Sequence, residues 1–321
     1  MKRLLLLRRF PEADRALIRE RLAGRYEVID WPGDDGNGRV AAAAAGAEVM
    51  LGNSMPTGVL AAARELRLLQ VAGAGVDRLD LAALTARGVV VCNSHSNAPF
   101  VAETAVALAL ALVKNTCRRD RGIRAGDWRP GPVGTLLGRT AGFFGFGHVG
   151  RHILRLLAGF RPAAVAWSRD IDPGDIAGLP PVEFLGPDEV LARADILFLC
   201  LPLTPDTRGC IMLRELRLLG PAGFLVNVAR AGLVNEDDLY RALAEDIIAG
   251  AGLDVWEAPV ECEGRKLPSS RPFHELDNVV LSPYCAGAAV GAPHLTAALD
   301  NLARYADTGR LESIISPAEG Y

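Results

Sequence analysis

The sequence lacks the features that would indicate a membrane, secreted or nucleic-acid-binding protein. Its apolar runs at residues 105–113 and 196–203 fall well short of the roughly 18 residues that a membrane-spanning helix needs. The six cysteines form no C-x-x-C pair, so we expect a reducing, cytoplasmic environment. There are 35 Lys and Arg against 38 Asp and Glu, for a net charge of −3, without a block of like charge. We therefore expect neither a membrane nor a nucleic acid as a partner.

Histidine is scarce as well. The five histidines are His95, His148, His152, His274 and His294. Their spacing is not typical of a metal site, so we expect no metal centre. The chain is rich instead in hydrophobic residues, at 50% against 23% charged, a composition that excludes disorder. Its 321 residues are about twice a typical domain of about 150, which predicts two domains.

Two series of short β-rich runs, separated by helical stretches, follow one another along the chain. The first series has runs at residues 4–7, 27–30, 48–52, 68–72 and 89–92. The second has six, at residues 140–144, 164–168, 196–201, 224–228, 248–253 and 279–281. Strands that alternate with helices indicate right-handed β-α-β units and parallel sheets covered on both faces. The sequence therefore predicts an α/β fold with two doubly wound parallel-sheet domains.

The order of these segments predicts that the two domains are interleaved. A helical pattern at residues 293–307 comes after the last strand, so we expect it to return to the first domain. A flavodoxin-like substrate domain would then consist of residues 1–97 and 291–321. A Rossmann cofactor domain of residues 98–290 would be inserted into it.

A glycine-rich hexamer follows the first strand of the second series. It consists of Gly145, Phe146, Gly147, His148, Val149 and Gly150. In a dinucleotide site the first glycine permits a tight turn, the second lets the backbone approach a pyrophosphate, and the third allows close helix–strand packing. The N-terminus of the following helix favours the negative charge. The hexamer alone is also compatible with a plain tight turn, but its strand-loop-helix setting predicts binding of a nicotinamide dinucleotide.

The end of the next strand bears on the choice between NAD and NADP. Ser168 stands 18 residues after Gly150. At about 20 residues, an NAD site places an acid that accepts bonds from the ribose 2′-OH. Here Arg169 follows the serine, and the acid is delayed to Asp170. A hydroxyl and a guanidinium suit a 2′-phosphate, so we expect NADP(H). The alternative is that Arg169 is a solvated loop charge and Asp170 still binds the ribose of NAD.

Five further segments carry motifs that belong together. They read VAGAGVD at residues 71–77, NAPFVAE at 97–103, GDW at 126–128, LPLTPDT at 201–207 and NVARAGLVN at 227–235. With the glycine hexamer, they resemble the D-isomer-specific 2-hydroxyacid dehydrogenase family. The resemblance runs from about residue 68 to residue 290. It implies a homodimer that pairs through the cofactor domain and the interdomain helix.

The resemblance also implies roles for individual residues. Backbone N–H groups at Ala74 and Gly75 would hold the substrate carboxylate. Arg230 would grip a 2-oxo acid through two parallel hydrogen bonds, with a structural salt bridge as the alternative. Asp254 would approach the nicotinamide, with a buried structural carboxylate as the alternative. The other implied cofactor contacts are Leu201, Pro202, Thr207, Val228, Ala229, Arg230, Tyr284 and Ala286.

Two catalytic positions depart from the pattern of that family. The family orients a catalytic histidine with a glutamate, but this chain has Pro259 at the glutamate position and Tyr284 at the histidine position. Glu257, Glu261 or Glu263 could replace the glutamate through a shifted loop, and we take Glu257 as the candidate. A solvated acidic loop is the alternative. Tyrosine ordinarily has a pKa near 10 against about 6.5 for histidine, so reduction, with Tyr284 donating the proton, should be the easier direction.

Three functions follow as hypotheses. The first is an oxidoreductase that reduces a small 2-oxo acid such as glyoxylate or hydroxypyruvate with NADPH, with NADH as the other possibility. Arg230 would anchor the substrate and Tyr284 would donate the proton. The second is an NAD(P)-binding regulatory or assembly protein with little dehydrogenase activity. The third keeps the enzyme but has a substrate that needs no strong base.

Three large aromatic side chains are expected to serve packing rather than substrate recognition. They are Phe100, Trp128 and Trp256.

Overall fold

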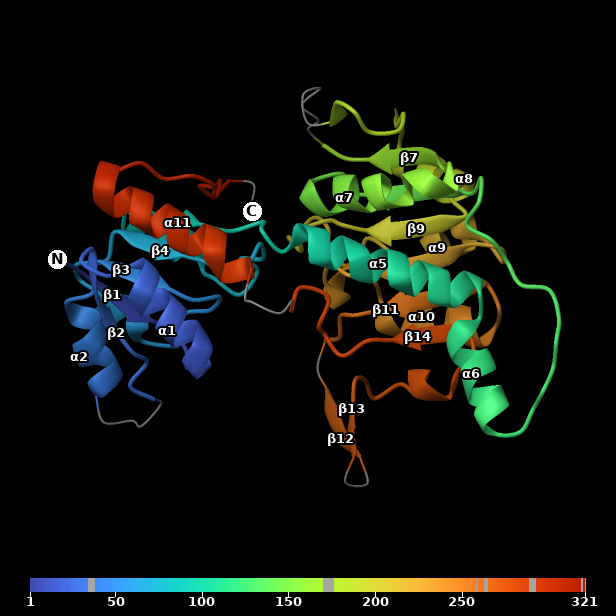
Figure 1. The fold of residues 1–321 in the computed structure, drawn as a ribbon, viewed down its shortest axis with the longest axis horizontal. Helices are drawn as coiled ribbons and strands as arrows, with labels where there is room; N and C mark the ends of the chain where they lie inside the picture. Colours follow the sequence, from blue (N-terminus) through green and yellow to red (C-terminus); the bar gives the residue numbers. More distant parts are fainter. Residues whose placement is uncertain are drawn as a thin grey trace. The chain divides into compact units, whose positions relative to one another are not determined.

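The computed structural model describes residues 1–33, 38–169, 176–257, 259–262, 265–288, 293–318 and 320. These residues form two compact units (Figure 1). Unit 1 consists of Met1–Asn97 and Ala289–Tyr321, and unit 2 of Ala98–Ala288. The domain boundary predicted after residue 290 lies outside the described residues.

Unit 1 is built on a parallel five-stranded sheet with the order β2-β1-β3-β4-β5. Its strands are β1 Lys2–Leu6, β2 Tyr26–Ile29, β3 Val49–Leu51, β4 Leu68–Gln70 and β5 Val90–Cys92. Its helices are α1 Glu12–Arg21, α2 Arg39–Ala45, α3 Val59–Ala62, α4 Leu81–Ala86 and α11 Pro293–Thr308. This strand order is that of flavodoxin-like sheets.

The residues of the first strand explain why this sheet is covered on both faces. Successive strand residues point to opposite faces, and all four leucines from Leu4 to Leu7 are buried. Leu4 and Leu6 join the core that includes residues of α1 and α11, while Leu5 and Leu7 join the core on the other face. The run of four leucines has no polar residue because helices exclude water from both faces of the sheet. Figure 1 shows α11, from the end of the chain, beside the sheet of unit 1, where its residues share a core with Leu4 and Leu6 of β1.

Unit 2 contains a parallel seven-stranded sheet with the order β14-β11-β10-β9-β6-β7-β8. Its strands are β6 Thr140–Phe144, β7 Ala163–Trp167, β8 Glu183–Phe184, β9 Ile196–Leu199, β10 Phe224–Asn227, β11 Gly250–Leu253 and β14 Val279–Leu281. Its α-helices are α5 Ala98–Val113, α6 Thr116–Arg124, α7 His148–Leu157, α8 Pro187–Arg193, α9 Leu213–Leu219 and α10 Glu236–Ala244. Short 3-10 helices are η1 Ala158–Phe160, η3 Ala231–Leu233 and η4 Phe273–Glu275. This is the strand order of a Rossmann sheet with β14 added at one edge.

The predicted fold class, two doubly wound parallel sheets in an α/β protein, is confirmed. Among the described residues of unit 2, three short strands differ from the prediction and appear only in the structure. β8 has two residues, both exposed, and therefore shows no apolar run. β12 Val260–Cys262 and β13 Arg265–Leu267 form a separate antiparallel pair.

α5 is an apolar helix that buries half of its 16 residues. It packs against the strands β10, β11 and β14 and against α7 (Figure 1). No single helix among the described residues is long and apolar enough to cross a membrane. α5 and α6 are together long and apolar enough for a span by length and composition alone, but they are bent by 60° at their junction.

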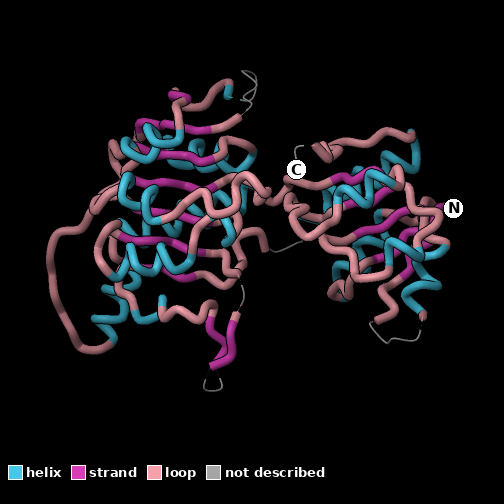
Figure 2. The backbone as a smooth tube through the Cα atoms, turned by 180° about the vertical axis from the view of Figure 1, so that it is seen from behind, coloured by secondary structure: helices cyan, strands magenta, loops and turns pink. Residues whose placement is uncertain are grey.

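After α6, residues 125–139 run along the outside of unit 2 without helix or strand (Figure 2). Trp128 in this loop is 78% exposed. The prediction that Trp128 is a packing residue is therefore wrong for the single chain, because the glycines and prolines around it form no element that could bury it. Phe100 and Trp256 are partly buried.

Candidate functional site

The glycine hexamer lies at the switch point of the unit 2 sheet. β6 is paired with β7 on one side and with β9 on the other. In open α/β sheets, ligands bind outside the carboxyl ends of the strands at such a point. Two hydrogen bonds tie the loop to both neighbours: Gly145 N donates to the Trp167 oxygen (2.8 Å), and Cys200 N donates to the Phe144 oxygen (2.7 Å).

The three glycines of the hexamer have different surroundings. Gly145 has a φ of +84°, and a Cβ atom there would lie 2.8 Å from the carbonyl oxygen of Cys200. A Cβ atom at Gly150, in the first turn of α7, would lie 3.0 Å from the oxygen of Gly145. At Gly147, by contrast, apart from the glycine itself and its two chain neighbours, no described atom lies within 4 Å of the Cβ position. The fold itself thus favours glycine strongly at 145 and leaves little room for a side chain at 150, while the open space at Gly147 fits a pyrophosphate at the helix N-terminus.

Ser168 and Arg169 follow β7 at the same edge of the sheet. Phe144 is paired with Trp167, so the residues after β7 stand beside the start of the hexamer. Ser168 is partly buried and Arg169 is exposed. Asp170, the competing acid, lies outside the described residues.

The loop after β9 is closed by a threonine. Thr207 is buried, its Oγ1 donates to the Pro202 oxygen (2.7 Å), and the same Oγ1 accepts a bond from Thr204 N (2.8 Å). Leu201 is partly buried beside Pro202. The two bonds of Thr207 therefore tie the loop together next to the glycine hexamer. Before the loop, burial raises the pKa of the Cys200 thiol to about 12, so this cysteine is neutral at physiological pH.

A buried amide fixes the backbone that carries Arg230. Asn227 ends β10 and is buried. Its Nδ2 donates to the Arg230 oxygen (2.9 Å), and its Oδ1 accepts a bond from Ala229 N (3.1 Å). The Arg230 Nη1 donates to the Ala229 oxygen (2.8 Å). Val228, between Asn227 and Ala229, is buried as well. The backbone that carries Arg230 is therefore held by this burial and by the two bonds of Asn227.

A buried carboxylate binds the turn that carries Tyr284. Asp254 follows β11 and is only 3% exposed. Its Oδ1 accepts bonds from Ser282 Oγ (2.5 Å) and Cys285 N (3.0 Å), and its Oδ2 accepts one from Ala286 N (3.0 Å). Tyr284 itself has a φ of +59° and is 60% exposed. The structural alternative for Asp254 therefore has direct support, and its approach to a nicotinamide stays a prediction.

The acidic loop after Asp254 has a cationic neighbour. Glu257 forms an ion pair with Arg208, with 3.8 Å between Oε1 and Nη1. Both side chains are more than half exposed, so the pair contributes little to stability. Pro259 is exposed, Glu261 lies in β12, and Glu263 lies outside the described residues. The catalytic role of Glu257 stays a prediction.

In unit 1 the predicted substrate loop follows β4. Its first carbonyl groups are bound by residues that follow β5. Ser94 N donates to the Gly73 oxygen (3.0 Å), and Asn93 Nδ2 donates to the Ala74 oxygen (2.9 Å). The loop residues Ala74 and Gly75 are partly buried. Their peptide planes are thus anchored to the sheet of unit 1.

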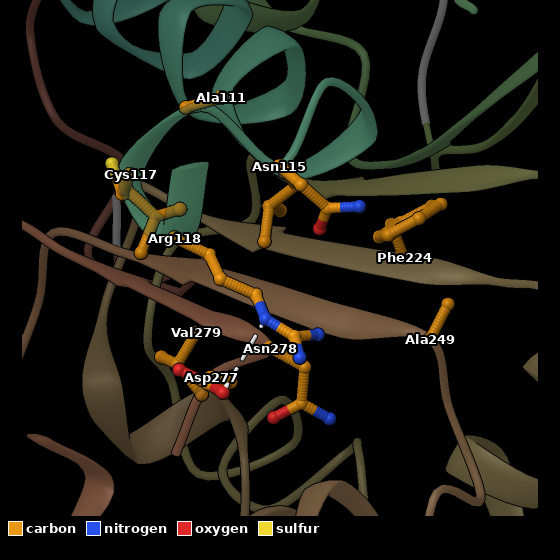
Figure 3. A pocket seen from close by; sticks show the side chains of 11 residues that line it. Ala111, Asn115, Cys117, Arg118, Phe224, Ala249, Asp277, Asn278 and Val279 are labelled. Carbon is orange, nitrogen blue, oxygen red and sulfur yellow. Dashed lines mark ion pairs between the residues drawn. The ribbon is translucent and has the colours of Figure 1, made fainter. Parts of the chain in front are cut away.

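A small hollow lies at the amino ends of the strands in the unit 2 sheet. It is lined by the amino ends of β10 and β14 and by the junction of α5 and α6 (Figure 3). Arg118 crosses it toward Asp277, with 3.4 Å between Nε and Oδ2, and Arg121 shares the same carboxylate (3.1 Å). These charges satisfy one another, and the hollow lies away from the carboxyl ends where open α/β sheets bind ligands. We assign no ligand to it.

Residues 106–286 match the family model described as D-isomer specific 2-hydroxyacid dehydrogenase, NAD binding domain. The D-3-phosphoglycerate dehydrogenase of Mycobacterium tuberculosis is 36% identical over 279 residues, which are 84% of this chain and 51% of that protein. The glyoxylate reductase of Thermococcus onnurineus is 31% identical over 311 residues, 90% of this chain and 88% of that protein. The chain thus spans about half the length of the phosphoglycerate dehydrogenases that it matches.

Solved structures are similar in fold to both units. The NADPH-dependent glyoxylate/hydroxypyruvate reductase of Sinorhizobium meliloti, in complex with NADP and malonate, superposes with a TM-score of 0.81 at 27% identity. The match covers 98% of this chain and 97% of that one. The similarity therefore extends over both units and not only over the residues of the family model.

Proposed function

Because the chain belongs to the D-isomer specific 2-hydroxyacid dehydrogenase family, we propose that it transfers a hydride between NAD(P)H and a small 2-oxo or 2-hydroxy acid. One observation carries this proposal. The glycine hexamer follows β6, Arg230 follows β10 and Tyr284 follows β14, so all three lie at the carboxyl ends of strands in one parallel sheet. Relatives named glyoxylate reductase and hydroxypyruvate reductase support a small 2-oxo acid as the substrate. Reduction is the favoured direction.

Arg230 anchors the substrate in this proposal. A guanidinium presents its N–H groups as a planar fork, which can bind one carboxylate oxygen and the neighbouring carbonyl oxygen of a 2-oxo acid through two charge-assisted hydrogen bonds. Asn227 donates to the Arg230 oxygen and accepts from Ala229 N, and these bonds, which hold the backbone of the arginine, support that role. For unit 1 we propose that the N–H groups of Ala74 and Gly75 bind a substrate carboxylate.

Tyr284 donates the proton. A phenol is a hydrogen-bond donor at neutral pH and can protonate the oxygen of a carbonyl group as negative charge develops on it. A neutral phenol is a poor general base, so the reverse direction is disfavoured. Glu257 is our candidate for the catalytic carboxylate that Pro259 cannot supply, although its ion pair with Arg208 competes with that role.

We propose NADP(H) as the preferred cofactor, with NAD(H) as the alternative. The hydroxyl of Ser168 and the guanidinium of Arg169 support binding of a 2′-phosphate, and the S. meliloti relative was solved with NADP. When bound, the cofactor supplies the hydride. The proposed contacts are Gly145, Phe146, Gly147, His148, Val149, Gly150, Ser168, Arg169, Leu201, Pro202, Thr207, Val228, Ala229 and Ala286.

A panel of 2-oxo acids tests the function. The purified protein is expected to oxidise NADPH with at least one small 2-oxo acid, and to do so faster than with NADH. Tyr284→Phe is expected to lower kcat for reduction by about 10²-fold, because it removes the proton donor. The affinity for NADPH, measured by fluorescence, should not change. Stopped-flow absorbance at 340 nm measures the rate.

The matched control is Tyr240→Phe. Tyr240 lies in the same unit, where its ring packs on Phe273, and is expected to be neutral for turnover. Full activity of Tyr284→Phe would remove Tyr284 from the mechanism. Tight NADPH binding without turnover of any oxo acid would contradict the proposed activity and favour a regulatory or assembly role.

We further propose a homodimer that buries the segment after α5. Ile123, Trp128, Val133 and Leu137 are exposed apolar side chains within one stretch of 15 residues. Monomeric proteins rarely expose large contiguous apolar patches, and such patches mark interaction sites. Light scattering is expected to give twice the chain mass of 34.1 kDa for the native protein. Trp128→Ser is expected to give the mass of one chain.

Met212→Ser is the control for that measurement, since Met212 is also an exposed apolar residue of unit 2 but lies outside the segment. A native protein that is monomeric at tens of micromolar, or a Trp128→Ser variant that is still dimeric, would contradict the proposed interface.

We also propose a cytoplasmic location. Cys92, Cys117, Cys200, Cys210 and Cys285 are free thiols, which supports a reducing compartment.

A further inference from the structure

The turn of residues 282–286 is held from the end of β11. Asp254 accepts the three hydrogen bonds described above, from Ser282 Oγ, Cys285 N and Ala286 N. Two residues further on, Trp256 Nε1 donates to the Ser282 oxygen (2.8 Å). Both ends of the turn are therefore bound by side chains that follow one neighbouring strand, and the residue in the middle of the turn is the proposed proton donor.

The backbone conformation of Tyr284 explains why such support is needed. A bulky residue with a positive φ is uncommon, and it persists only where its surroundings impose the conformation. The N–H groups of Cys285 and Ala286, which follow Tyr284, converge on the two oxygens of one carboxylate. Consecutive N–H groups that converge in this way form a site for an anion. Asp254 is that anion, and a neutral side chain could not accept all three bonds equally well.

We propose that Asp254 is a positioning residue, which fixes the left-handed turn from which Tyr284 donates its proton. The proposal rests on the proposed function, and it gives Asp254 a role that does not require contact with the cofactor. Both carboxylate oxygens are already bound by donors of the turn, and the side chain is buried. The nearby Glu257 is exposed instead and pairs with Arg208. The buried acid, and not the exposed one, therefore holds the turn.

The hold on the turn can be measured without any substrate. Cys285 is exposed and lies next to Tyr284, and its N–H donates to Asp254. In Asp254→Asn the amide places an NH2 group against an N–H group of the turn. We expect N-ethylmaleimide to modify Cys285 about fivefold faster in this variant, because a charge-assisted hydrogen bond is lost. Mass spectrometry of the Cys285 peptide reads the rate, with the partly buried Cys117 as the internal reference.

Turnover then separates positioning from cofactor binding. Asp254→Asn is expected to lower kcat for reduction about 30-fold while the Kd for NADPH stays within about twofold. In a Tyr284→Phe background the same change is expected to cost less than about twofold, since the group that Asp254 positions is already absent. Asp277→Asn is the control, because Asp277 lies in exposed ion pairs at the amino ends of the strands.

A milder variant covers the case in which Asp254→Asn does not fold. Ser282→Ala removes one of the three donors and keeps the carboxylate, and we expect about a threefold loss of kcat. Ser282 Oγ also lies 3.4 Å from Cys285 Sγ, so kcat, and not Cys285 modification, is the readout for this variant. The proposal is overturned if Cys285 modification is unchanged in folded Asp254→Asn, or if kcat is unchanged in Ser282→Ala. It is also overturned if Asp254→Asn weakens NADPH binding, or loses as much activity in the Tyr284→Phe background as in the native protein. If the native protein turns over no oxo acid, the proposed function fails, and faster Cys285 modification still shows that Asp254 holds the turn.

Discussion

Replacing Arg230 by glutamine is expected to lower kcat/KM for a 2-oxo acid by about 10³-fold, since two charge-assisted hydrogen bonds are each worth about 1.5–3 kcal/mol. Arg230→Lys keeps the positive charge but loses the planar fork, so its kcat/KM should lie between those of the native protein and Arg230→Gln. The affinity for NADPH should change little in both variants. Initial rates over a range of oxo acid concentrations, with NADPH binding measured separately by fluorescence, provide the test.

The control for these variants is Arg271→Gln, which removes an arginine of the same unit that pairs with Asp237 on the surface. It should leave kcat/KM unchanged. Normal kinetics in Arg230→Gln would show that Arg230 is only a structural residue of the β10 loop. A loss of NADPH affinity as large as the loss of kcat/KM would assign it to the cofactor and not to the substrate.

The parts of the site that could be predicted from the sequence are those in which neighbouring residues carry the whole signal. The glycine hexamer is one continuous strand-loop-helix segment, so its strand and helix could be predicted from the order of apolar residues and glycines. The two sheets followed from the same alternation, because each buried strand is a short apolar run. β8 lacks such a run, with Glu183 and Phe184 both exposed, and it was missed for that reason.

The support of the turn around Tyr284 could not be predicted in this way. Asp254 and Ser282 are 28 residues apart, and a carboxylate in the sequence does not reveal which N–H groups it will accept. The left-handed conformation of Tyr284 is likewise imposed by tertiary contacts and not by its local sequence, since a tyrosine has no preference for a positive φ. The exposure of Trp128 has a related cause. Aromatic residues are usually buried, but this side chain stays 78% exposed because no part of the described chain covers it.

Gly147→Ala is expected to weaken NADPH binding by about 10- to 100-fold, because a methyl group in a closely fitted site costs about 1–3 kcal/mol. It should not destabilise the protein. Beyond the adjacent residues of the chain, no described atom lies within 4 Å of the Cβ position, and the backbone there, at φ −77° and ψ −152°, is extended. At such a position alanine raises the free energy of unfolding by up to about 1 kcal/mol. Fluorescence titration with NADPH and thermal unfolding without the cofactor measure the two effects.

Gly145→Ala provides the contrast that gives this result its meaning. At φ +84°, with Cys200 O only 2.8 Å from the Cβ position, alanine is expected to lower the free energy of unfolding by about 2–4 kcal/mol. Loss of NADPH binding in that variant could therefore follow from a damaged fold. Loss of binding in Gly147→Ala could not, because nothing in the described part of the protein occupies the space that the methyl group would take. If Gly147→Ala is as stable as the native chain and binds NADPH equally well, the pyrophosphate does not lie at the N-terminus of α7.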